Sequence, residues 1–305
     1  MRNSRIGIYL LLVLPPLFWA GNTVLARGIA DIIPPVAMSF WRWTIALLIL
    51  LPFTWKQTLN DWPEIKKHWK IISLLGLFGI ASFNTLLYTA AHSTTAINIA
   101  LTQSVMPVII VSISFVLFRD RITRIQIFAI ILCTLGAGYI VIHGDWHRLL
   151  QLEFVIGDLI MLLAVGLYAL YSVLLRKRPD IKPMSFLTTT FAVGVVLLLP
   201  LYLWERQTAA PLELTQPVIL SLLYVSVCPS ILAYLFWNQG IHEIGANQAG
   251  LYINLIPLFA SLLAVLFLDE RFQSYHFVGI ILITSGLLLF NLRFLRSRRL
   301  SDYTD

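Results

Sequence analysis

Long apolar stretches alternate with short polar ones along the whole chain. Each stretch has about 20 residues and few charges, which is what an α-helix needs to cross a bilayer. The longest polar interval, residues 56–70, has 15 residues and leaves no room for a soluble domain. The pattern predicts an all-α polytopic membrane protein with ten transmembrane helices, at residues 7–27, 35–55, 71–91, 96–118, 125–142, 156–175, 184–204, 217–240, 246–268 and 274–292.

The composition supports lipid as the solvent. Of the 305 residues, 58% are hydrophobic and 12% are charged, against about 25% charged residues in ordinary globular domains. Mean hydropathy is +0.82. Soluble, disordered and disulfide-scaffold classes are thereby excluded. The first apolar stretch has no small-residue cleavage site, so we interpret it as an uncleaved span and not as a signal peptide.

Lysine and arginine positions predict the orientation. With the N-terminus in the cytoplasm, 17 of these residues fall on the inner side, 4 on the outer side, and Arg42 lies within a span. Such a bias is typical of the positive-inside rule. We therefore expect both termini to be cytoplasmic, with a basic tail at residues 293–305. The net charge of +7 then requires no nucleic-acid partner.

The chain aligns with itself after a shift of 150 residues. Ten identities fall between residues 88 and 139 without a gap, among them Pro107 with Pro257 and Gly136 with Gly286. The sequence therefore predicts two repeats of five spans, at residues 7–142 and 156–292. Because five is odd, the second repeat enters the membrane inverted, as in many secondary transporters that alternate access around a central site.

Several short motifs accompany the ten spans and two repeats: Phe18-Trp19-Ala20-Gly21-Asn22, Phe40-Trp41-Arg42-Trp43, Ala91-His92-Ser93-Thr94-Thr95-Ala96 and Leu268-Asp269-Glu270-Arg271-Phe272. Together these features resemble the drug/metabolite transporter superfamily, in particular its EamA-type transporters, although Phe118-Arg119-Asp120-Arg121 departs from the usual acidic form. The resemblance covers nearly the whole chain and implies a bacterial inner-membrane, multi-pass exporter of amino acids, other metabolites or drugs. It also implies a cavity lined by the first, third, fourth, sixth, eighth and ninth helices.

Polar and aromatic residues within the spans recur three or four positions apart, so each pair shares a helix face. The first repeat places them in the outer half of the bilayer and the second in the inner half, as alternating access requires. Mid-helix prolines also favour a cavity. We predict a substrate cavity of Trp19, Asn22, Arg42, Asn84, Tyr88, Asn98, Gln103, Tyr168, Tyr171, Tyr234, Asn238, Gln248, Tyr252 and Asn254, with kinks at Pro107, Pro229 and Pro257.

Other interpretations of these residues stay open. Tyr88 and Asn238 are close enough to helix ends to belong to an interfacial belt. Asn and Gln side chains also hold membrane helices together, and the prolines are also consistent with packing kinks. Arg42 has two interpretations: its side chain reaches the outer interface, or it points inward to an ion pair or a substrate carboxylate, with Asp158 as a candidate partner.

The predicted function is a secondary transporter that exports small amphipathic metabolites, such as amino acids. No Asp, Glu or Lys lies deep in any span, which disfavours proton antiport through a membrane carboxylate. The alternatives are a drug or organic-cation exporter of the same fold and a non-transporting membrane scaffold. We predict no catalytic residue, metal or cofactor. The expected partners are a small-molecule substrate and the lipid bilayer, and a monomer suffices for the fold.

Overall fold

The computed structural model describes residues 2–28, 32–151, 155–209, 212–267 and 273–301, and all the regular structure in these ranges is helical. Nine of the described helices are long and apolar enough to cross a membrane, and Ser274–Phe290 is a shorter apolar helix. The prediction of an all-α polytopic membrane protein is therefore confirmed, while the tenth span stays a prediction. The nine are Gly7–Ala26, Pro35–Asn60, Trp69–Ala91, Asn98–Phe118, Arg124–Val141, Ile156–Lys177, Pro183–Thr208, Gln216–Ile244 and Ala246–Leu263.

Several spans consist of more than one helical segment. In the first half of the chain the segments are α1 (Arg2–Leu11), α2 (Leu14–Gly28), α3 (Pro35–Asn60), α4 (Trp62–Lys67), α5 (Trp69–Leu75), η1 (Gly76–Ser82), α6 (Phe83–Ala91), α7 (Ala96–Ser104), α8 (Met106–Phe118), α9 (Arg124–Val141) and α10 (Trp146–Leu150). In the second half they are α11 (Ile156–Leu174), η2 (Leu175–Lys177), α12 (Pro183–Thr208), α13 (Gln216–Ser226), η3 (Val227–Leu232), α14 (Ala233–Ile244), α15 (Ala246–Gly250), η4 (Leu251–Asn254), α16 (Leu255–Phe267) and α17 (Ser274–Ser301).

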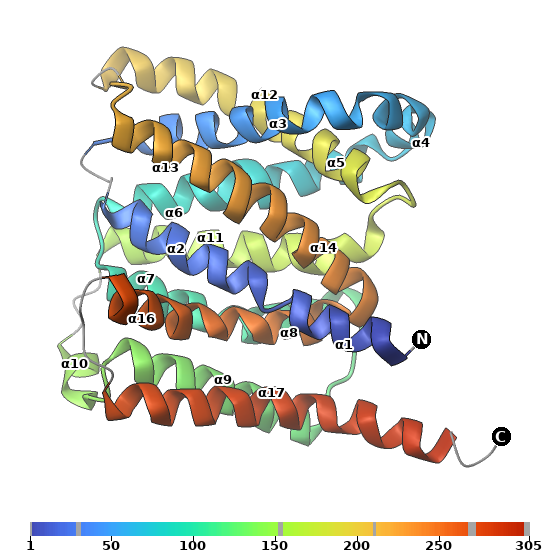
Figure 1. Cartoon of the computed structure of the whole chain (residues 1–305), viewed down its shortest axis with the longest axis vertical. Helices are drawn as coiled ribbons and strands as arrows, with labels where there is room; N and C mark the ends of the chain where they lie inside the picture. Colours follow the sequence, from blue (N-terminus) through green and yellow to red (C-terminus); the bar gives the residue numbers. More distant parts are fainter. Residues whose placement is uncertain (1, 29–31, 152–154, 210–211, 268–272, 302–305) are drawn as a thin grey trace.

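The long helices lie roughly side by side in one elongated bundle (Figure 1). Helix α3 packs against α12 at one edge of the bundle, and α9 packs against α17 at the other. Helices α2, α6, α11, α14 and α16 lie between these two pairs. The first residues of α1 and the last residues of α17 lie at the same end of the bundle. The tail predicted at residues 293–305 continues α17 as far as Ser301, and residues 302–305 lie outside the described ranges.

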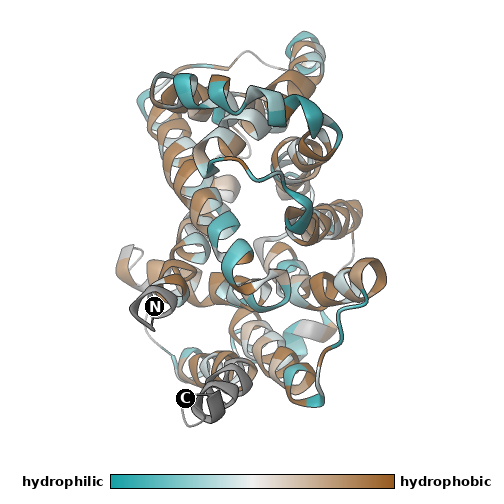
Figure 2. Ribbon diagram, turned by 90° about the vertical axis from the view of Figure 1, so that its right-hand side faces the viewer, coloured by the Kyte–Doolittle hydropathy of each residue, from teal (hydrophilic) through white to brown (hydrophobic). Residues whose placement is uncertain are grey.

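The outer surface of the bundle is apolar. The helix bodies are predominantly hydrophobic, and hydrophilic residues gather on the connections and helix ends that face the viewer in Figure 2. Large side chains such as Phe53, Val196 and Trp204 are two thirds or more exposed. A soluble protein seldom carries so much exposed apolar surface, so these side chains are expected to face lipid.

Proline residues set helix starts and interruptions. Pro35 and Pro183 occupy the first turns of α3 and α12, where a missing N–H costs no hydrogen bond. The predicted kinks all fall at irregular backbone. Pro107 follows the break between α7 and α8, Pro229 lies in the π-helix η3, and Pro257 follows the 3₁₀ segment η4.

A second π-helix, η1, has no proline and was not predicted. It lies in the third span, as η3 lies in the eighth, and the two begin at residues 76 and 227. Gly79 makes room for the Tyr171 ring, because a β-carbon at this position would overlap that ring. Its carbonyl oxygen accepts a hydrogen bond from the Tyr234 hydroxyl. The irregular segment thereby brings α11 and α14 against the third span, and π-segments of this kind are frequent at functional sites.

Candidate functional site

Arg42 is fully buried and joins four spans. Its guanidinium donates to Ser230 Oγ (2.6 Å), Asn22 Oδ1 (3.2 Å), Asn84 Oδ1 (2.8 Å), Tyr88 Oη (2.8 Å) and the Pro229 carbonyl oxygen (3.0 Å). The guanidinium also lies over the Trp43 ring, 4.9 Å from its centroid. The Arg42 side chain therefore points inward and does not reach the outer interface. All five acceptors are neutral, and no ion pair of Arg42 occurs among the described residues.

Asp158, the candidate partner of Arg42, has other contacts. Its carboxylate accepts hydrogen bonds from the Thr94 hydroxyl, Asn98 Nδ2 (3.1 Å) and the Val155 backbone N–H (2.8 Å). These bonds tie the start of α11 to the turn before α7. A pairing of Asp158 with Arg42 is therefore wrong, because the carboxylate is already engaged at the end of its helix.

An aromatic cluster lies beside Arg42. The indole of Trp19 donates to the Pro229 carbonyl (3.1 Å). Its ring meets Tyr168, Tyr234 and Trp237 edge to face, with centroids 5.7, 6.3 and 5.3 Å away. Tyr171 packs on Tyr168 at 5.3 Å. Edge-to-face aromatic pairs add about 0.5–1.5 kcal/mol beyond area burial, so this centre is well packed.

Several contacts in the centre join residues 148 to 150 positions apart. Trp19 meets Tyr168, and Trp43 meets Phe191 at a centroid distance of 4.7 Å. The Asn84 amide lies 3.5 Å from the Tyr234 hydroxyl. Two Tyr–Asn hydrogen bonds also lie at equivalent places in the two halves of the chain. Tyr88 donates to Asn22 (2.9 Å), and Tyr171 donates to Asn238 (2.7 Å). The first and third spans are thus joined in the same way as the sixth and eighth.

The space left in the centre is small. A cavity of about 20 Å³ is lined by Trp19, Asn22, Gln103, Met106 and Tyr168, among others. This volume holds about one water molecule. The centre as observed is therefore closed, and a metabolite would enter only after these side chains move apart.

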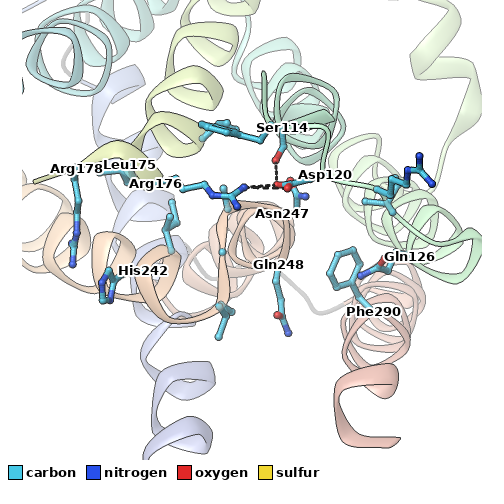
Figure 3. Close-up of a pocket in the computed structure, with 18 of the residues that line it drawn as sticks. Ser114, Asp120, Gln126, Leu175, Arg176, Arg178, His242, Asn247, Gln248 and Phe290 are labelled. Carbon is cyan, nitrogen blue, oxygen red and sulfur yellow. Dashed lines mark hydrogen bonds and ion pairs between the residues drawn. The ribbon is translucent and has the colours of Figure 1, made fainter. Parts of the chain in front are cut away.

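A much larger cavity, the vestibule, opens at one end of the bundle. It has a volume of about 1050 Å³ and is lined by the turns after α8, η2 and α14, as Figure 3 shows. Arg176 reaches across it to Asp120 (3.1 Å), which also accepts a hydrogen bond from Ser114 (2.7 Å). Burial lowers the pKa of Arg178, which lies at the same rim. Pockets of about 300–1000 Å³ are typical for small-molecule ligands, so the vestibule is large enough to admit one.

Some predicted cavity residues lie apart from the centre. Asn98 is bound to Asp158. Gln248 lines the vestibule and donates to the Tyr9 hydroxyl (3.2 Å). Tyr252 is buried in η4. The Asn254 amide, with its nitrogen toward the Ser104 carbonyl (3.1 Å) and its oxygen toward the Thr134 N–H (3.3 Å), holds η4 against α7 and α9.

Other residues of the site were not predicted. Ser230 and Trp237 contact Arg42 and Trp19. A serine directly after Pro229 in an apolar span was the only signal for the first of these. The acidic motif Leu268-Asp269-Glu270-Arg271-Phe272 lies outside the described residues. Within the described part of the chain, no three His, Cys, Asp or Glu side chains are grouped to hold a metal ion.

Comparisons with known proteins agree on one family. The model of the EamA-like transporter family matches residues 6–142 and again 155–292. The uncharacterized transporter YyaM of Bacillus subtilis is 26% identical over 289 residues, with 93% of each chain covered. An uncharacterized transporter of Archaeoglobus fulgidus is 26% identical over 94% of this chain and 97% of its own.

Two further comparisons concern a shorter match and the fold. Protein PecM of Dickeya dadantii is 28% identical over 243 residues, which are 78% of each chain. A solved crystal structure has the same fold, with a TM-score of 0.74 at 17% identity and coverage of 96% of this chain and 98% of its own. Because the family model covers most of the chain in two matches, this protein is a multi-pass membrane protein that belongs to the EamA-like transporter family.

Proposed function

We propose that this protein is a secondary transporter that exports small amphipathic metabolites, such as amino acids, by alternating access. The observation that carries the proposal is the contrast between an open vestibule and a closed centre. One end opens into the vestibule of about 1050 Å³. At the closed centre, the hydrogen bonds of Arg42 join the first, second, third and eighth spans. A wide opening on one side of a closed centre is what one state of an alternating-access cycle requires.

The lysine and arginine distribution orients this arrangement. The rim of the vestibule includes Arg121, Arg176 and Arg178, which lie in the segments assigned to the cytoplasm by the positive-inside rule. We therefore propose that the vestibule faces the cytoplasm of a bacterial cell, with both termini on the same side. The substrate would then enter from the cytoplasm, as an exporter requires.

The proposal also includes two inverted five-helix repeats. The two family matches and the contacts between residues 148 to 150 apart support this symmetry. Arg42 departs from this symmetry. Thr190 lies at the corresponding position of α12, and its hydroxyl donates only to carbonyl groups of its own helix. Opening the outer side would therefore require the Arg42 bonds to Pro229 and Ser230 to break. The bond that reaches across the vestibule is of another kind, the ion pair between Arg176 and Asp120, whose side chains are 60% and 36% exposed.

The experiment is a metabolite profile of the medium from cells that produce the protein, with an empty vector for comparison. Met106→Trp would fill the central cavity whatever the charge of the substrate. Val105→Trp, on the exposed side of the same turn, is the matched control. We expect a compound class to accumulate outside with the wild type and Val105→Trp but not with Met106→Trp, at equal amounts of protein in the membrane. Media that match the empty vector would contradict export.

A drug or organic-cation exporter of the same fold is the second candidate. The Trp19 and Tyr168 rings favour it, because aromatic faces bind cations. The positive charge of Arg42 at the centre opposes it. Accumulation of an amine instead of an acid in the medium would favour this candidate. A membrane scaffold that does not transport would leave every compound in the medium at the level of the empty vector.

A further inference from the structure

The buried polar atoms without a partner at the centre can all donate hydrogen bonds, and among them the Tyr168 hydroxyl can also accept one. Gln103 Nε2 and the Tyr168 hydroxyl both belong to side chains that line the small cavity, and the two residues are 4% and 2% exposed. Asn238 Nδ2, close to Tyr171, is also without a partner. The Tyr234 hydroxyl, next to Tyr168, donates to the Gly79 carbonyl. Unpaired donors in a membrane interior are costly, so a ligand that accepts hydrogen bonds would relieve this cost.

The charge at the centre is positive. Like the unpaired donors, it favours a ligand with a negative charge. Arg42 has only neutral acceptors among the described residues, and one of them, Asn22, also lines the cavity. Asp158 is engaged by Thr94 and Asn98. A positive charge deep in a membrane without a counterion is expensive. An anionic group in the cavity would supply the missing negative charge.

We propose that the central site recognises a carboxylate and does not recognise an ammonium group. This inference rests on the proposed function and names its substrate class: small carboxylates with a compact apolar body. A carboxylate only accepts hydrogen bonds and would take them from Gln103 Nε2 and the Tyr168 hydroxyl, with the charge of Arg42 behind Asn22. Phe83, Met106 and Ile256 line the same cavity and would contact the body.

An ammonium group would meet the opposite situation. It has three donors and no acceptor, so it would add donors to a site that already has too many. The aromatic faces offer it little space, because the Trp19, Tyr168 and Tyr234 rings pack against one another. An amino acid would therefore bind through its carboxylate, and removal of its amino group should not weaken binding.

The test is binding of matched probes to the purified full-length protein in nanodiscs, measured by calorimetry. Hydrocinnamate, its alcohol, its amine and phenylalanine share one body, and isocaproate, its alcohol, its amine and leucine share another. We expect a carboxylate to bind about tenfold or more tightly than its alcohol, the gain typical of a charge-assisted hydrogen bond. The amine should bind more weakly than the alcohol, and the amino acid no more tightly than the carboxylate. Equal or tighter binding of an amine or alcohol, or no binding of either carboxylate, would overturn the proposal.

Two substitutions at one position locate the binding group. Gln103→Leu removes the donor at similar volume and should weaken carboxylate binding about tenfold, with little effect on the alcohol. Gln103→Glu should reverse the ranking in favour of the amine. Thr102→Val is the control, since the Thr102 hydroxyl donates only to Asn98 O of its own helix. If Gln103→Leu leaves carboxylate binding unchanged, the assignment fails, whereas export in the metabolite profile would still support transport.

Discussion

Arg42 shows how one polar residue can organise the interior of a membrane protein. Its cost in a bilayer is a few kcal/mol or more, and hydrogen bonds to three other spans offset it. The planar guanidinium suits this task, because its five donors point in fixed directions. Neutral acceptors satisfy the donors and leave the charge itself uncompensated, so that a substrate anion can interact with it.

Arg42→Lys should destabilise the protein although it keeps the charge. The ammonium has three donors and lacks the planar fork of the guanidinium, so at least two of the five acceptors of Arg42 would lose the hydrogen bond from this position. Each buried polar group left unpaired costs roughly 1–3 kcal/mol. Thermal unfolding in detergent measures the effect. Arg206→Lys, at an exposed position, should unfold at the wild-type temperature. Equal unfolding temperatures for both variants would mean that Arg42 is not held as described.

At the scale of elements, the π-helices η1 and η3 shape the centre. Each adds a wide turn in the middle of a span and frees backbone groups for other partners. The Pro229 carbonyl of η3 accepts from Arg42 and Trp19, and the Gly79 carbonyl of η1 accepts from Tyr234. The polar contacts of the site thus depend on main-chain irregularity as well as on side chains.

Gly79→Ala should disturb this centre. The added methyl would overlap the buried Tyr171 ring, and overpacking of this kind costs about 1–3 kcal/mol. Gly166→Ala is the matched control, because nothing lies within 4 Å of a β-carbon there, and alanine in a helix interior is more stable than glycine by roughly 0.5–1 kcal/mol. Unfolding temperatures should therefore move in opposite directions. A neutral Gly79→Ala would contradict the described packing of η1 on α11.

The sequence predicted the elements better than their contacts. Hydropathy located the nine spans found among the described residues, because bilayer thickness acts locally. Pro107, Pro229 and Pro257 lie at or next to irregular backbone, while their role in forming a cavity stays a prediction. The π-helix η1 has no such local signal. Helical spacing identified the faces that carry Asn84 and Tyr88, which meet Arg42. The same spacing could not tell that Asn98 faces Asp158, because the neighbour of a helix face depends on tertiary packing.

At the scale of the whole molecule, the family model matches each half of the chain, and Arg42 lies in the first half only. Contacts between residues about 150 apart extend from Trp19 with Tyr168 at the centre to Cys133 with the Ile283 carbonyl, where α9 packs against α17 at one edge of the bundle. The vestibule opens at one end of the bundle, whereas Arg42 is buried at the centre. In an alternating-access cycle, a residue in the central cavity must become accessible from both sides in turn.

The most direct measurement is the reaction of a single cysteine in the central cavity with a membrane-impermeant thiol reagent. Cys133 and Cys228 are first replaced by alanine, and Met106→Cys is then labelled in intact cells and in inside-out vesicles. Asn247→Cys, in the vestibule, serves as the control that should react only in the vesicles. If the central cavity opens to each side in turn, Met106→Cys reacts from both sides of the membrane. Reaction of Met106→Cys from one side only would contradict alternating access around this site.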